Sequence, residues 1–243
     1  MTADHLSRFS DTRWIDAINN DPANQDPILC DIKVGYKTDS GFVTELNGTT
    51  QRLAAALKHP GFKKEMIDAI TIDTVHWPHD LIEQPALSAI KSLTFSEREK
   101  DQRYRWADSA WDYENSRLVM IKDIIESPHL RSLETLRDND CGKYWPVAKL
   151  VAKSTNLVNL RSLEFREPDH TEKFITAYEK ALQASMDSTQ PMPLPKLERV
   201  NGISLPESII NLRERVSAQA LEGDASKKNW VQDLKEPRVV RDR

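Results

Sequence analysis

Short stretches with one shared arrangement of apolar and variable positions recur along the chain. In each stretch an apolar residue is followed by two variable positions, an apolar residue, one variable position and a further apolar residue. The second half of this arrangement alternates in the way a β-strand does, so it predicts a short strand. The central apolar residues, which we expect to lie side by side, are Ile32, Ile70, Leu93, Leu136, Leu163 and Ile203.

Between these stretches the apolar residues are spaced by three and four positions, which predicts helices. The expected helices are Thr49–Leu57, Asp112–Ile125, Trp145–Lys153, Thr171–Ser185 and Pro206–Leu221, with a short capped helix from Ser10 to Ile18. Proline follows some of them, as in His59-Pro60 and Ser127-Pro128, and there it ends the helix and turns the chain toward the next strand.

The repeating unit is therefore helix, turn and short strand. A single unit cannot bury both its strand face and its helix face, so the units must stack, with parallel strands in one layer and helices in the other. The stretches Ser127-Pro-His-Leu-Arg-Ser-Leu-Glu-Thr-Leu and Ser154-Thr-Asn-Leu-Val-Asn-Leu-Arg-Ser-Leu-Glu-Phe are the two most similar units.

These units resemble the leucine-rich-repeat family, in its ribonuclease-inhibitor-like type, from about Leu29 to Leu205. The resemblance implies an α/β solenoid with parallel strands on a concave face, helices on a convex face and helical caps at both ends. The chain departs from the family at the Asn/Cys position: Cys141 occupies it in one unit, while other residues do so elsewhere. The competing interpretation is an ordinary α/β domain with parallel strands and crossover helices.

The expected organisation has three parts. Residues 1–27 form an N-terminal cap, and residues 28–222 form the repeat domain. Residues 96–127 form a helical insertion in that domain, broken near Ala107–Ser109. Residues 223–243 form a polar C-terminal tail that we expect to be partly disordered.

In such a solenoid the variable strand positions point to the concave face, which is the expected contact surface for a partner. One row of these positions runs from Asp31 to Gly202 and a second from Lys33 to Ser204. The alternative is that they are simply solvated sheet residues. The candidate partner-binding residues in these rows and in the next one are Thr94, Thr135, Arg137, Asn139, Ser162, Glu164 and Arg166.

The 96–127 insertion adds a second candidate contact surface. Tyr104, Trp106 and Trp111 form an aromatic cluster there, next to a run of charged residues. Exposed aromatic residues beside arginine are common at the energetic centre of protein interfaces. The alternative is that these rings pack the insertion onto the core, because large aromatic residues are mostly buried.

Two short clusters contain residues with metal-binding chemistry. His76-Trp77-Pro78-His79-Asp80 has two histidines and a carboxylate, but a structural zinc site needs about four protein ligands and no Cys/His pair elsewhere completes the set. Asp138-Asn139-Asp140-Cys141-Gly142 lacks the spacing and the distal glutamate of an EF-hand. No Walker loop, G-x-G-x-x-G or G-x-S-x-G motif is present. We therefore expect no catalytic residues, no metal and no cofactor.

Composition narrows the functional classes. The chain has 243 residues, of which 39% are hydrophobic and 30% charged, and its net charge of -4 disfavours nucleic acid as a partner. It has only two cysteines, no apolar N-terminal segment and no apolar run long enough for a membrane span, so we expect a soluble cytoplasmic protein. The expected function is a non-enzymatic scaffold that binds a protein partner. Alternatives are a subunit of a larger assembly, or a metal-dependent enzyme or enzyme regulator that uses the His76–Asp80 loop.

Overall fold

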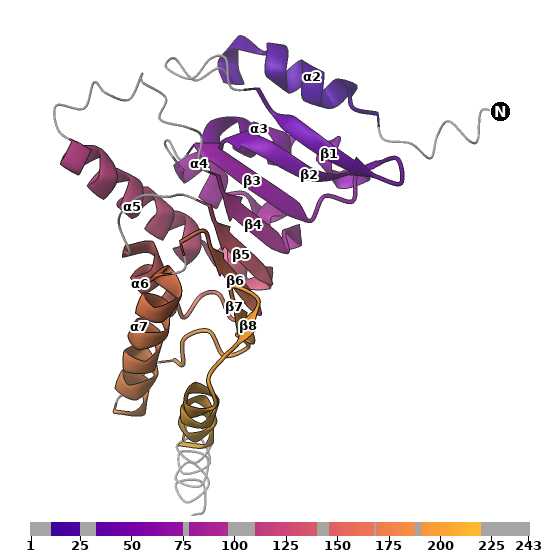
Figure 1. Ribbon diagram of the computed structural model, residues 1–243. Helices are drawn as coiled ribbons and strands as arrows, with labels where there is room; N and C mark the ends of the chain where they lie inside the picture. Colours follow the sequence, from indigo (N-terminus) through magenta and orange to yellow (C-terminus); the bar gives the residue numbers. More distant parts are fainter. Residues whose placement is uncertain are drawn as a thin grey trace, which may run out of the picture.

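Strands of the protein pair in the order in which they occur along the chain. The computed structural model describes residues 11–24, 33–74, 78–96, 110–139, 146–167, 169–187 and 191–219. Their strands form one eight-stranded open sheet of order β1-β2-β3-β4-β5-β6-β7-β8, with helices packed beside it (Figure 1). The expected mixed α/β architecture is therefore confirmed.

The sheet is parallel except at its two ends. Its strands are β1 (Gly35–Asp39), β2 (Phe42–Thr49), β3 (Ala69–Thr74), β4 (Ser92–Phe95), β5 (Thr135–Asp138), β6 (Ser162–Phe165), β7 (Arg199–Val200) and β8 (Ile203–Ser204). Strands β2 to β7 run parallel, whereas β1 and β8 are antiparallel to their neighbours. One row of buried residues crosses the parallel strands in register: Leu46, Ile70, Leu93, Leu136, Leu163 and Val200.

Helices lie along one side of this sheet. They are α3 (Thr50–Lys58), α4 (His79–Ile82), α5 (Ala110–Glu126), α6 (Pro146–Ala152) and α7 (Asp169–Met186), and residues 207–219 are also helical. The helix α2 (Arg13–Asn20) lies at the β1–β2 end (Figure 1). Strands β4, β5 and β6 share one pattern of alternating half-exposed and buried residues, in which the half-exposed residues are polar and the buried ones are apolar except for Asp138. One face of the sheet therefore packs in the core with the helices, while the other carries polar side chains.

Turns between the helices and strands repeat as regularly as the strands do. The backbone N–H groups of Lys91, Glu134, Arg161 and Glu198 each donate to the carbonyl oxygen of the equivalent residue one strand earlier, at 2.6, 2.8, 2.8 and 2.9 Å. On the helix side, the Asn156 side chain donates to the backbone oxygens of Ile125 (3.0 Å) and Ser127 (2.6 Å). These repeated bonds satisfy backbone groups that the short strands leave unpaired.

A hairpin with a two-residue turn forms each end of the sheet. Ser40 and Gly41 connect β1 to β2 with φ of 51° and 87°, and Asn201 and Gly202 connect β7 to β8 with φ of 51° and 74°. Positive φ at both central residues is the geometry of the tight turn that suits the twist of two antiparallel strands. The hairpins thus change the direction of the chain where the parallel stack begins and ends.

At both ends of the row of buried strand residues, the sequence prediction was wrong because a hairpin lies there. The predicted first strand around Ile32 is replaced by β2 with Leu46, and Ile32 itself lies outside the described residues. At the other end Val200 pairs with Leu163, whereas Ile203 lies on β8 and is 68% exposed. The last predicted stretch was therefore wrong by three residues, because an Asn-Gly turn ends the parallel strand there.

The helices predicted from the sequence agree closely with those observed. The predicted Thr49–Leu57, Asp112–Ile125, Trp145–Lys153 and Thr171–Ser185 correspond to α3, α5, α6 and α7. Thr49 is the N-cap of α3, where its hydroxyl accepts a hydrogen bond from the Arg52 backbone N–H at 3.3 Å. The break predicted near Ala107–Ser109 and the tail 223–243 lie outside the described residues, and the division of the chain into cap, repeat domain and tail stays a prediction. Within the described ranges, none of the helices is both long and apolar enough to span a bilayer.

One buried tyrosine ties α7 to the segment before β7. Tyr178 is fully buried, and its hydroxyl donates to the backbone oxygen of Leu194 at 3.0 Å, with the oxygen of Pro193 at 3.3 Å. Burial disfavours the ionised phenolate and raises the pKa of Tyr178 from 10.0 to about 12, although the nearby Arg213 acts in the opposite direction. The native state therefore prefers the protonated phenol more strongly than the unfolded chain does.

We expect the free energy of unfolding to decrease between pH 10 and pH 12 because of Tyr178. Below pH 10 the phenol is protonated in both states; above it the unfolded chain loses the proton first, which favours unfolding by up to about 2 to 3 kcal/mol. Urea denaturation of the wild type and of Tyr178→Phe at a series of pH values measures this term. The variant should be about 1 kcal/mol less stable at pH 8 but should show a flatter pH dependence. Tyr36→Phe, which removes an exposed hydroxyl, is the control. Equal slopes in all three proteins would contradict the prediction.

Candidate functional site

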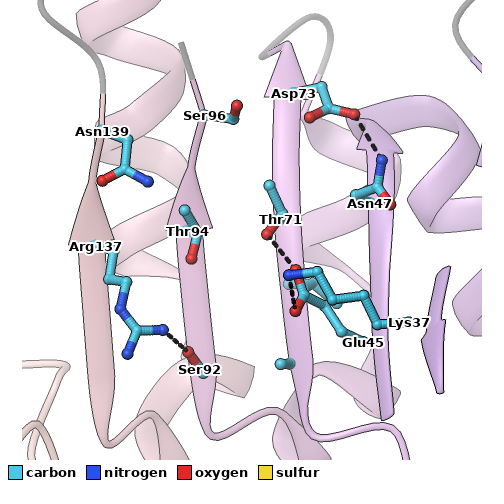
Figure 2. Close-up of a pocket in the computed structure, with 12 residues that line it drawn as sticks. Lys37, Glu45, Asn47, Thr71, Asp73, Ser92, Thr94, Ser96, Arg137 and Asn139 are labelled. Carbon is cyan, nitrogen blue, oxygen red and sulfur yellow. Dashed lines mark hydrogen bonds and ion pairs between the residues drawn. The ribbon is translucent and has the colours of Figure 1, made fainter. Parts of the chain in front are cut away.

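Polar side chains cover the face of the sheet opposite the helices. We call this surface the polar face and define it by the outward residues of β2 to β6 and of the positions directly after them. These residues are Glu45, Asn47, Ala69, Thr71, Asp73, Ser92, Thr94, Ser96, Thr135, Arg137, Asn139, Ser162, Glu164 and Arg166. Figure 2 shows most of the residues from β2 to β5 standing on their strands, with helices behind the sheet.

The polar face is hollowed over β1 to β5. The hollow has a volume of about 470 Å³ and is open to solvent. It is lined by side chains of β2 to β5 and by Lys37, which reaches in from β1 (Figure 2). Strand β4 and the position after it contribute only hydroxyl groups here, from Ser92, Thr94 and Ser96. The floor of the hollow is therefore made of short hydroxyl-bearing side chains, with longer charged ones around it.

On the β1–β3 side, two carboxylates are held by neighbouring side chains. Glu45 accepts hydrogen bonds from Lys37 Nζ at 2.7 Å and from the Thr71 hydroxyl at 2.8 Å. Asp73 accepts one from the side-chain amide of Asn47 at 3.1 Å. The Glu45 side chain is 20% exposed while that of Lys37 is 71% exposed. The partners thus fix the orientation of both carboxylates, as the dashed lines in Figure 2 mark.

On the β4–β6 side, an arginine spans three strands. Arg137 on β5 donates through Nε to Glu164 on β6 at 2.7 Å and through Nη1 to the Ser92 hydroxyl on β4 at 3.4 Å. Their side chains are 43% and 41% exposed, so this ion pair is worth at most about 1 kcal/mol to stability. A pair this exposed is readily exchanged for contacts with another molecule, because neither group has lost most of its water.

A second row of charges lies where the strands begin. Successive strands there carry charges of alternating sign, and two ion pairs form between neighbours: Lys91 with Glu134 at 3.3 Å, and Arg161 with Glu198 at 2.6 Å. The four side chains are about half exposed, between 46% and 53%. This row belongs to the rim rather than to the polar face, and it supplies matched positions for control variants.

Most of the predicted partner-binding residues lie together on the polar face. Thr94, Thr135, Arg137, Asn139, Ser162, Glu164 and Arg166 all belong to it. Tyr104 and Trp106 lie outside the described residues, and Trp111 lies in α5 with a side chain that is not described. The interpretation of the 96–127 insertion as a contact surface therefore stays a prediction.

The sequence prediction missed the β1–β2 part of this surface. The two predicted rows began at Asp31 and Lys33, but Glu45 and Asn47 take those places in the sheet. Asp31 lies outside the described residues and Lys33 precedes β1. At the other end, Gly202 lies in the hairpin turn and Ser204 on the antiparallel β8, so neither continues its row. The overlooked signals were the alternation in residues 35–49 and the turn-forming dipeptides Ser40-Gly41 and Asn201-Gly202.

The clusters considered for metal binding are only partly described. His79 and Asp80 lie exposed in the first turn of α4, while His76 and Trp77 lie outside the described residues. Asp138 at the end of β5 is buried, and Cys141, like Cys30, lies outside the described residues. In the part of the chain that the structure describes, His, Cys, Asp and Glu residues form no group of three or more that suits a metal ion.

Comparison of the chain with protein-family profiles, with curated proteins and with solved structures finds no match.

Proposed function

We propose that this protein is a non-enzymatic interaction module that binds a protein partner through the polar face. The observation that carries the proposal is the division of the sheet into two unlike faces: one packs against helices, and the other presents hydroxyl, amide and charged groups across β2 to β6. Such groups bind by adaptable hydrogen bonding and by charge, as the polar parts of protein interfaces do.

The same features support a stacked-repeat architecture of the leucine-rich-repeat kind. Consecutive strands are neighbours in the sheet, the row from Ile70 to Leu163 falls in register, and the turns repeat their backbone hydrogen bonds. In repeat proteins of this kind, one long surface is built from equivalent positions of successive units and is used for binding. We propose this architecture as the reason why the chain places its variable residues in rows.

Affinity purification of the tagged protein from its native source tests the proposed function. Arg137→Glu/Arg166→Glu reverses two charges on the polar face. The matched control is Arg131→Glu/Lys173→Glu, which makes the same change of charge at exposed positions on η5 (Pro128–Ser132) and α7. We expect a partner at fixed stoichiometry with the wild type and the control, and a loss of about tenfold or more with the face variant.

Equal recovery of the partner with all three proteins would contradict binding through the polar face. Thermal unfolding of each variant should accompany the purification, because a face variant that unfolds early would lose its partner for a trivial reason. All four substituted side chains are solvent-accessible, so we expect each variant to keep its fold.

A further inference from the structure

Charge is distributed unevenly across the polar face. At the β1–β3 end, Glu45 is paired with Lys37, while Asp73 accepts a hydrogen bond from the neutral amide of Asn47. At the β5–β7 end, the outward residues include one glutamate, Glu164, and three arginines. These are Arg137, Arg166 and Arg199, the last in register with Ser162. The face therefore has an acidic end and a basic end.

The two ends are separated by strand β4, whose outward residues carry no charge. Ser92, Thr94 and Ser96 are half-exposed hydroxyl residues. Thr71 on β3 is level with Arg137 on β5, and Asp73 lies two residues beyond Thr71. The two charged residues are therefore two strand spacings apart across the sheet and two residues apart along it, or about 12 Å in all. A ligand that satisfies both must carry opposite charges at a similar separation, with polar or small groups between them.

The size of the polar face favours a narrow ligand. Five strands, β2 to β6, at a spacing of about 4.8 Å give a width of roughly 20 Å, and the outward rows cover roughly 13 Å along the strands. Such a surface offers only a few hundred Å², below the roughly 800 Å² per partner that stable complexes of folded domains bury. A second copy of this chain, or any other broad globular surface, would therefore be held weakly by this face alone, whereas a single chain segment fits across it.

We propose that the polar face binds a short linear segment of a protein partner that carries a basic residue over Asp73 and an acidic residue over Arg137 and Arg166. This inference rests on the proposed function and adds the chemistry of the partner. An extended segment advances about 3.3 Å per residue, so the two charged residues are about three to four positions apart when the segment runs across the strands. A polyanion such as a nucleic acid would be repelled at the acidic end.

A random peptide library displayed on phage and selected on the full-length protein tests this inference. We expect selected peptides to be enriched in Lys or Arg about three to four positions from Asp or Glu, with polar or small residues between. One selected peptide and a counterpart with its two charges exchanged are then synthesised, and their affinities are measured by fluorescence anisotropy. The exchanged peptide should bind about tenfold more weakly.

A reversal of the charges on the protein should reverse that preference. In Asp73→Lys/Arg137→Asp/Arg166→Asp the acidic end gains a net positive charge and the basic end a net negative one, so the exchanged peptide should become the tighter ligand by about tenfold. The matched control is Lys91→Glu/Glu134→Lys, which exchanges the charges of a rim ion pair and should keep the wild-type preference.

The possible outcomes separate this inference from the proposed function. Selected peptides without paired opposite charges, or with binding that the face variant leaves unchanged, would overturn the segment chemistry, as would a selection without enrichment. None of these outcomes decides whether a partner from the native source depends on Arg137 and Arg166, which is the measurement for the proposed function itself.

Discussion

Replacing Leu136 with alanine is expected to lower the free energy of unfolding by about 3 to 5 kcal/mol. Leu136 lies on β5, between Leu93 on β4 and Leu163 on β6, and all three side chains are fully buried. The substitution removes an isopropyl group. It therefore loses the free energy gained by transferring that group out of water, and it leaves a cavity in the centre of the row. The regular backbone ladders on both sides restrict how far the neighbouring strands can move to fill it.

Ile203→Ala is the matched control for that substitution, because it also shortens an aliphatic side chain to a methyl group. Ile203 is 68% exposed on β8, so we expect a change of less than about 0.5 kcal/mol. Urea denaturation followed by far-UV circular dichroism measures both variants. Comparable losses in the two would mean that Ile203, and not Val200, occupies the buried row.

Replacing Asn201 with alanine is the second large effect, expected to cost about 2 to 4 kcal/mol. Asn201 has a φ of 51°, a left-handed conformation that penalises alanine by about 1 to 2 kcal/mol. Its side chain also joins two elements: Oδ1 accepts a hydrogen bond from the Phe165 backbone N–H at 2.5 Å, and Nδ2 donates to the Thr171 hydroxyl at 2.7 Å. Alanine removes both bonds and leaves a partly buried N–H without its acceptor.

Asn201→Asp separates these contributions. Aspartate tolerates the left-handed conformation nearly as well as asparagine does, and its carboxylate can still accept from Phe165 and from the Thr171 hydroxyl. We expect it to cost less than about 1 kcal/mol in the same denaturation experiment. If aspartate and alanine are equally destabilising, the side-chain oxygen of Asn201 contributes little to the junction between β6 and the last hairpin.

The sequence alone predicts the middle of this fold well. Ile70, Leu93, Leu136 and Leu163 are correctly placed in neighbouring parallel strands, because each is preceded three residues earlier by another buried apolar residue and followed by strand alternation. The helices between them follow from apolar residues spaced by three and four. Local periodicity is sufficient here because every unit is built in the same way from residues close together in sequence.

At the ends of the sheet the same periodicity is ambiguous. Leu197, Val200 and Ile203 are three residues apart, so two alignments of the repeat fit equally well. The Asn201-Gly202 turn selects the alignment in which Val200 is buried. Both turn residues have positive φ, and the turn reverses the chain directly after Val200. The first strand was misplaced for a similar reason: residues 35–49 form a hairpin whose two strands lack the spacing of the repeat.

The candidate site was likewise predicted in the middle of the sheet but not at its β1–β2 end. Its β4–β6 half follows from the parallel strands that were assigned correctly, whereas Lys37, Glu45 and Asn47 were missed together with β1 and β2. The pairing of Arg137 with Glu164 could not be predicted from either residue alone, because it depends on the register of two strands that are 27 residues apart in the chain.

The hairpins at the two ends of the sheet also bear on aggregation. The edge strands of a sheet have unpaired backbone N–H and C=O groups, to which strands of other chains can add. Long, flat edges are therefore sites of aggregation. Here β1 is antiparallel to β2, carries the charge of Lys37 and has an irregular register between Lys37 and Thr38, while β8 is only two residues long. An incoming strand meets a bent, charged edge at one end and a very short one at the other. The protein should therefore remain dispersed at concentrations where a stack with bare parallel edges would polymerise.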